Sequence, residues 1–201
     1  MSREARRTQL IEATIDTIAA RGYSRTTLTE VARTAGLSHG LVLFHFETKE
    51  KLLSETLAYL SEEYLQNWQT ALAGVGDDPA EQLNALIEAD FNPAICTPSR
   101  LAAWCAFWGE AQSRPLYQGT YGTLDEAYNR RLEGICARLS DLGSYGRNPV
   151  QVARILRLTI EGVWLDMMTM ATPYTREEGL ATARACAAMS FPDHFGPEGL
   201  K

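Results

Sequence analysis

The stretch TLTEVARTAGLS occupies residues 27–38, and residues 39–52 continue it as HGLVLFHFETKEKL. Thr27 followed by Glu30 matches a capping box, in which the threonine hydroxyl accepts from an orphan amide while the glutamate reaches back. A short helix is therefore expected to follow Thr27, and Gly36 ends it. Ser38 is then the N-cap of another short helix over about 39–45. Two short helices joined by a glycine turn are typical of a helix-turn-helix.

Helical periodicity continues on both sides of this motif. A helix over residues 3–21 is expected, because apolar side chains recur along one face and Gly22 supplies a C-cap. Thr48 can cap a fourth helix, whose apolar positions recur for about 25 residues. After a break at Gly74–Pro79, periodicity resumes, and further helices are expected at about 99–112, 115–140, 150–171 and 175–189. No segment has the pattern of a strand, so the sequence predicts an all-α fold.

Length and composition restrict the class of protein. The chain has 201 residues, 45% of them apolar and 22% charged, which is ordinary for a globular protein. No apolar run approaches the roughly 18 residues of a membrane span, and the charged start of the chain does not lead into an apolar signal core. The four scattered cysteines indicate neither a disulfide framework nor a zinc site. We therefore expect a cytoplasmic protein with no membrane partner, metal or cofactor.

Charge is distributed unevenly along the chain. Residues 1–51 carry eight Lys and Arg against six Asp and Glu, a net charge of +2. The remainder carries eleven against nineteen, a net charge of −8. A basic N-terminal part attached to an acidic body fits a small DNA-binding module carried by a domain that has another task.

The helix-turn-helix stretch resembles the TetR family of bacterial repressors, in unbroken register from Thr27 through the FHFETKEKL segment that follows the second short helix. The resemblance implies that Thr27 and Ser38 contact DNA phosphates at helix N-termini. It also implies base-reading positions on the recognition helix, which lies in the major groove. These positions are His39, Gly40 and Val42.

The same resemblance implies that His45 and Lys49 grip the phosphate backbone, with Lys49 as the firmest contact. Leu43 and Phe44 stand where the family commonly has two tyrosines. Phe44 is thus a DNA-facing residue without a phenolic hydroxyl. Affinity for DNA then depends more strongly on Lys49 and on the nearby arginines Arg6 and Arg25.

The second part of the chain contains WCAFWGE at residues 104–110 and EGVWLDMM at residues 161–168. These stretches resemble the C-terminal domain of the BetI-like branch of the same family, which is associated with a choline response. An aromatic cluster with acidic neighbours can hold a quaternary ammonium by cation–π attraction. The candidate effector-binding residues are Phe91, Trp104, Trp108, Tyr121 and Trp164. Core packing is the alternative interpretation for Trp104 and Trp108.

Domain organisation follows from these patterns. We expect a three-helix helix-turn-helix domain over 1–48, a helical effector-binding and dimerisation domain over 49–190, and a loosely ordered tail over 191–201. Two DNA half-sites need a two-fold protein, so a homodimer is expected. The predicted interface consists of apolar stripes on the last two long helices, with intramolecular core as the alternative. These stripes are Leu156, Ile160, Val163 and Met167, and Leu180, Ala183 and Ala187.

The favoured function is a repressor that binds a palindromic double-stranded DNA operator. A small-molecule effector, choline-like or another lipophilic cation, releases it by favouring a different spacing of the recognition helices. A constitutive dimeric regulator without an effector is the alternative. An enzyme is disfavoured, because the chain has no Gly-x-Ser-x-Gly, phosphate-loop or His-Glu-x-x-His motif, and no catalytic residues are assigned.

Overall fold

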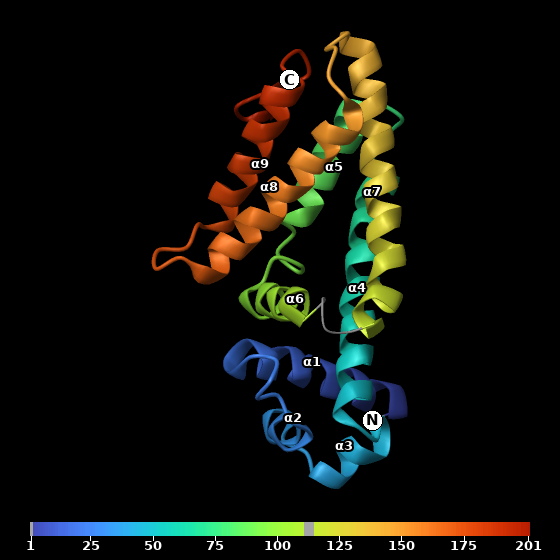
Figure 1. The fold of residues 1–201 in the computed structure, drawn as a ribbon, viewed down its shortest axis with the longest axis vertical. Coiled ribbons are helices and arrows are strands. Elements are labelled where there is room, and N and C mark those ends of the chain that lie inside the picture. Colours follow the sequence, from blue (N-terminus) through green and yellow to red (C-terminus); the bar gives the residue numbers. More distant parts are fainter. Residues whose placement is uncertain (1, 111–114) are drawn as a thin grey trace. The chain divides into compact units, whose positions relative to one another are not determined.

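A computed structural model describes residues 2–110 and 115–201, with side chains described for 2–110 and 125–201. Helices make up most of these ranges (Figure 1). They are α1 (Arg3–Arg21), α2 (Leu28–Ala35), α3 (His39–Phe46), α4 (Lys49–Ala73), α5 (Pro79–Asp90), α6 (Pro98–Glu110), α7 (Pro115–Gly143), α8 (Pro149–Thr169) and α9 (Arg176–Ser190). The predicted all-α fold class is confirmed. Within the described ranges, no helix is long and apolar enough to cross a membrane.

The chain forms two compact units. Unit 1 comprises Met1–Glu63 and Thr97–Thr123, and unit 2 comprises Tyr64–Cys96 and Leu124–Lys201. The division falls inside α4 and not at residue 48, where the sequence suggested a domain boundary. Polar contacts join the N-terminal part of α4 to α1, since Arg7 pairs with Glu55 and the Tyr59 hydroxyl donates to Glu12 over 2.9 Å.

The core of unit 1 holds the helix-turn-helix together. Val31 of α2 and Val42 and Phe46 of α3 are fully buried, as are Leu10 and Ile15 of α1. Burying each such side chain contributes about 1.5–3 kcal/mol. These contacts fix the rotation of α3 about its own axis, and therefore decide which of its side chains face solvent.

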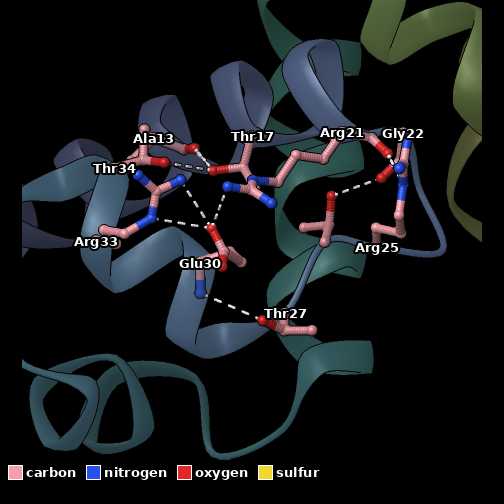
Figure 2. Close-up of polar contacts among 10 residues, drawn as sticks. Ala13, Thr17, Arg21, Gly22, Arg25, Thr27, Glu30, Arg33 and Thr34 are labelled. Atoms are coloured by element: carbon pink, nitrogen blue, oxygen red, sulfur yellow. Dashed lines mark hydrogen bonds and ion pairs between the residues drawn. The ribbon is translucent and has the colours of Figure 1, made fainter.

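The N-cap of α2 forms as predicted, but the capping box does not. The Thr27 hydroxyl accepts from the Glu30 amide over 3.2 Å. The Glu30 carboxylate turns instead to Arg21 and Arg33, at 3.0 and 2.8 Å (Figure 2). Two guanidinium groups attract the carboxylate more strongly than one backbone amide. A complete capping box is formed at α9, between Thr175 and Glu178.

In unit 2, α9 packs against α8, α5 and the C-terminal hairpin. Gly179 permits the close approach, because a Cβ at this position would lie 2.7 Å from Cε1 of Phe91 and 2.9 Å from Cγ1 of Val163. A larger residue at 179 therefore requires the Phe91 and Val163 side chains to move.

Residues 191–201 form a packed element and not the loosely ordered tail that the sequence suggested. Strands β1 (Phe195–Gly196) and β2 (Gly199–Leu200) pair antiparallel. Phe191 and Phe195 are fully buried. The hydroxyl of Tyr145 also lies 2.7 Å from Nδ1 of His194. Two buried aromatic rings outweigh the loop-forming tendency of the prolines and glycines.

Candidate DNA-binding surface and effector site

The exposed face of α3 consists of His39, Gly40, Leu43 and Phe44. Val42 faces the opposite way and is 0% exposed. The sequence-based assignment of Val42 to base edges is therefore wrong. Residues 42 and 46 are one turn apart, so burial of one in the core carries the other with it. The exposed face of α3 instead includes Leu43.

Thr27 and Ser38 lie at the N-termini of α2 and α3 with exposed side chains. Each hydroxyl accepts from a backbone amide of its own helix, Glu30 for Thr27 and Leu41 for Ser38. Each O–H therefore keeps its proton available for donation to a phosphate oxygen. The geometry is compatible with the predicted phosphate contacts at both positions.

His45 is 6% exposed, which corrects its predicted role as a backbone grip. Burial lowers the pKa of His45 below its usual 6.5, and the nearby cationic Arg3, Arg7 and Arg6 lower it further. Both effects favour the neutral form of the ring. Its backbone carbonyl accepts from Arg7 over 3.4 Å, so His45 acts in packing α3 against α1.

Lys49 begins α4 and is half-buried. Its ammonium group donates to the carbonyl oxygens of Tyr23 and Ser24, over 3.3 and 3.1 Å. It also lies 5.7 Å from the centroid of the Tyr23 ring. Lys49 thus holds the turn between α1 and α2. An ammonium has three N–H donors, and the third can still reach a phosphate.

Arginines gather where α1 begins beside α3. Arg3 lies over the Phe44 ring at 5.6 Å from its centroid, and Arg7 lies over the Phe46 ring at 4.9 Å. Because α1 starts at Arg3, these arginines belong to a helix. Arg3 places positive charge next to the exposed face of α3, whereas Glu55 compensates the charge of Arg7.

The predicted effector-binding residues are divided between the two units. Trp104 and Trp108 belong to unit 1, where their rings stack at 6.3 Å between centroids. Phe91 belongs to unit 2 and packs on Gly179 of α9, as a core residue does. Tyr121 lies outside the residues whose side chains are described. Trp164 alone joins a larger aromatic cluster.

That cluster lies in unit 2 around Asp90, the last residue of α5. Tyr64 donates to Oδ1 of Asp90 over 2.6 Å, and Tyr128 donates to Oδ2 over 2.9 Å. The Tyr64 ring meets Trp164 edge-on at 6.1 Å between centroids, and the Tyr128 ring meets Trp68 edge-on at 6.0 Å. A carboxyl group thus lies among four aromatic rings from α4, α7 and α8.

Asp90 is 1% exposed, and burial raises its pKa to about 7. Burial also raises the pKa of Asp125 and Glu161, which interact electrostatically with each other. Arg157 pairs with Glu161 at 2.6 Å. No cation is paired with Asp90 in the described part of the chain. The interior of unit 2 therefore holds more acidic than basic groups beside its aromatic rings.

One signal for this cluster is present in the sequence. Asp90 follows Leu83 and Ile87 at helical spacing, which places an acidic residue on the apolar face of α5. It also ends the helix, where the negative end of the helix dipole disfavours a carboxylate. An aspartate that is unfavourable on both counts departs from its local pattern, as residues at functional sites often do.

The predicted dimer stripes lie mainly in the core. Leu156, Ile160 and Val163 of α8 are at most 5% exposed, and Ala183 and Ala187 of α9 at most 1%. These residues therefore pack in the core of the chain, which was the alternative interpretation.

A different set forms what we call the α8 outer face: Ile155, Leu158 and Leu165, which are 55%, 51% and 46% exposed. Gly162 lies between them, and a Cβ at this position would meet no atom within 4 Å.

Comparison with known proteins agrees with this architecture. Residues 10–56 match the family described as bacterial regulatory proteins, tetR family, and residues 79–192 match the BetI-type transcriptional repressor C-terminal family. The fold and the surface of α3 thus define a helix-turn-helix DNA-binding regulator of transcription, and not an enzyme. More particularly, the chain belongs to the TetR family, with a C-terminal domain of the BetI type.

Individual relatives extend along most of the chain. The HTH-type transcriptional regulator BetI of Paraburkholderia xenovorans is 31% identical over 183 residues, which covers 90% of this chain and 91% of the relative. A transcriptional regulator from Pseudomonas aeruginosa PAO1 has a similar structure, with a TM-score of 0.78 at 24% identity and coverage of 94% and 91%. A regulator from Saccharomonospora viridis in complex with choline has a TM-score of 0.79 at 19% identity and coverage of 91% and 95%.

Proposed function

We propose that this regulator is a cytoplasmic repressor that binds a palindromic DNA operator as a homodimer and leaves it when a cationic small molecule binds in unit 2. The observation that carries the effector class is Asp90, a buried carboxyl group among four aromatic rings with no paired cation in the described part of the chain.

A bound cation compensates the negative charge of Asp90, which has no cationic partner among the described residues. The faces of the Tyr64, Trp68, Tyr128 and Trp164 rings attract a quaternary ammonium, by about 0.5–2 kcal/mol per desolvated ring. A quaternary ammonium has no N–H and needs no hydrogen-bond acceptor, so both oxygens of Asp90 can keep their tyrosine donors. The choline complex of the Saccharomonospora viridis regulator supports this effector class.

The α8 outer face supports the homodimer. Ile155, Leu158 and Leu165 expose apolar side chains one turn or two apart on one helix. Covering them with a second copy of the same face removes this area from water. Ala181 and Ala185 of α9 are exposed and small, and allow close helix packing beside it.

Release follows from linkage between the effector site and DNA. An effector that favours one spacing of the two recognition helices shifts the dimer away from the spacing that matches the operator. A coupling free energy of about 1–3 kcal/mol weakens DNA binding by roughly 5- to 150-fold. The continuous α4 carries residues of both units and is the natural element for this coupling.

The experiment measures how tightly the protein binds an operator selected from random duplex DNA. Binding is compared in the presence of choline and of its neutral carbon isostere, dimethylbutanol. We expect choline to weaken operator binding by roughly 5- to 150-fold, and the uncharged isostere to have no effect. Asp90→Asn removes the response, whereas Asp141→Asn, on an exposed position of α7, keeps it. Equal behaviour of the two compounds contradicts a cationic effector, and absence of any response favours a constitutive regulator.

The dimer is tested separately by sedimentation equilibrium. Leu158→Glu inserts a charge into the α8 outer face and is expected to give monomers with weakened operator binding. Leu142→Glu is the control, because Leu142 is 65% exposed at the end of α7 and lies off this face. A Leu158→Glu protein that remains dimeric contradicts the proposed interface.

A further inference from the structure

The exposed face of α3 is unusually apolar for a surface that reads DNA. Phe44 is 66% exposed and Leu43 is 38% exposed. On this face only His39 has a side chain that forms hydrogen bonds. The bidentate pairings through which arginine, asparagine or glutamine distinguish guanine and adenine are therefore not available from α3.

The exposure of Leu43 and Phe44 is not explained by the stability of unit 1. The core side of α3 is supplied by Val42 and Phe46, which are fully buried. Leaving a large apolar side chain in water forgoes most of the roughly 1.5–3 kcal/mol that its burial contributes. A surface that retains two such neighbours on one helix face indicates a partner with apolar groups.

Gly40 adds a second observation on the same face. A Cβ at position 40 would meet no atom within 4 Å, so packing does not require glycine there. Glycine in a helix is less stable than alanine by about 0.5–1 kcal/mol. The missing side chain leaves room for close approach of the partner beside Leu43 and Phe44, one turn away.

The charge around this face identifies the partner as nucleic acid. Arg3 lies over the exposed Phe44 ring, whereas Arg7 lies over the buried Phe46 ring and pairs with Glu55. A cation beside an apolar strip matches a major groove, whose edges are phosphates and whose floor carries one apolar group, the C5-methyl of thymine.

We infer that Leu43 and Phe44 read thymine through its C5-methyl group, and that this apolar contact is a main source of operator specificity. The inference rests on DNA binding by the helix-turn-helix and adds the chemistry by which α3 selects bases. The operator half-site accordingly contains thymine at the positions facing Leu43 and Phe44, while His39 supplies the polar contact.

The test replaces single thymines of the selected operator with deoxyuridine, which removes the methyl group and leaves every hydrogen-bonding atom unchanged. We expect a loss of affinity of about three- to tenfold at one or two thymines of each half-site, as burial of one methyl group implies. Replacement at the remaining thymines has no effect.

Protein variants locate the contact. Leu43→Ala and Phe44→Ala are expected to bind thymine and deoxyuridine operators equally at the sensitive positions, and both should fold because the two side chains are exposed. Phe44→Tyr keeps the ring and should keep the sensitivity, as should His39→Ala. The folded state of each variant is checked by its thermal transition.

The possible outcomes distinguish failure of the methyl readout from failure of the proposed DNA binding. Unchanged affinity at every deoxyuridine position overturns the methyl readout while leaving DNA binding intact. Methyl sensitivity that survives in both alanine variants also overturns it, since another residue then makes the contact. A folded chain that selects no operator overturns DNA binding itself and this inference with it.

Discussion

Arg100 in unit 1 is a cation that meets two carboxylates, whereas Asp90 in unit 2 is an anion that meets two hydroxyl groups. Arg100 forms a bidentate ion pair with Glu63, in which both hydrogen bonds are 2.7 Å long, and donates to Glu12 over 3.0 Å. These hydrogen bonds, with Glu63 first, raise the pKa of Arg100. Asp90 accepts from Tyr64 and Tyr128 and has no paired cation among the described residues.

Under the proposed function, this difference separates a charge that stabilises the fold from one that a ligand compensates. The Arg100 network ties α6 to α1 and α4 inside unit 1, and its charges compensate one another. Two hydroxyl dipoles reduce the cost of burying the Asp90 carboxylate but leave its charge in place. Burial without compensation is tolerated where a binding partner supplies the opposite charge.

The largest expected effect is on the pH dependence of stability through Asp90. Burial raises its pKa from the usual 3.8 to about 7, so between these values the folded state holds a proton that the unfolded state has lost. The free energy of unfolding therefore falls as pH rises from about 4 to 7, by up to about 4 kcal/mol. Urea denaturation at pH 5 and pH 8 measures this fall.

Asp90→Asn removes one titrating group and should reduce the slope of the pH profile, leaving the variant more stable than the parent protein at pH 8. Asp141→Asn is the matched control and should keep the parent slope. Parallel pH profiles for the parent protein and the Asp90→Asn variant would show that the pKa of Asp90 is not raised as predicted. The same substitution that stabilises the protein is expected to abolish the response to choline.

Breaking the compensated network should destabilise unit 1 by a smaller amount. Arg100→Met keeps the length of the side chain but leaves Glu12 and Glu63 without their guanidinium, at a cost of about 2–3 kcal/mol in the free energy of unfolding. Arg130→Met is the control, since Arg130 and Glu126 are about 70% exposed and 3.8 Å apart. Its cost should stay below about 0.5 kcal/mol. Equal costs for the two variants would contradict a structural role for Arg100.

The helices could be predicted from local signals, and the orientation of their side chains only in part. Thr27 and Ser38 act as N-caps because a hydroxyl reaches its own helix amides whatever the tertiary structure. In α3, by contrast, His39 and Gly40 are followed by LVLFHF, which has no polar face to set its rotation. Packing on α1 and α2 decides that Val42 turns inward and Phe44 outward.

The aromatic cluster could not be assembled from the sequence for a related reason. Its members Tyr64, Trp68, Asp90, Tyr128 and Trp164 come from four separated helices. Periodicity identifies each ring as a position on an apolar face but does not say which faces meet. Only Asp90 departs from its local pattern, and its significance depends on partners that the fold supplies.

The smallest expected effect concerns the tyrosine hydroxyl groups that donate to Glu12 and to Asp90. Tyr59→Phe removes the bond to Glu12, whose charge Arg100 still compensates, so the free energy of unfolding should fall by about 1 kcal/mol at pH 5 and pH 8 alike. Tyr128→Phe removes a bond to Asp90, which has no such cation. Its cost should therefore be concentrated at pH 8, where Asp90 is ionised, and be small at pH 5. Two pH-independent losses of equal size would mean that both carboxylates are equally compensated, and would remove the distinction on which the cationic effector rests.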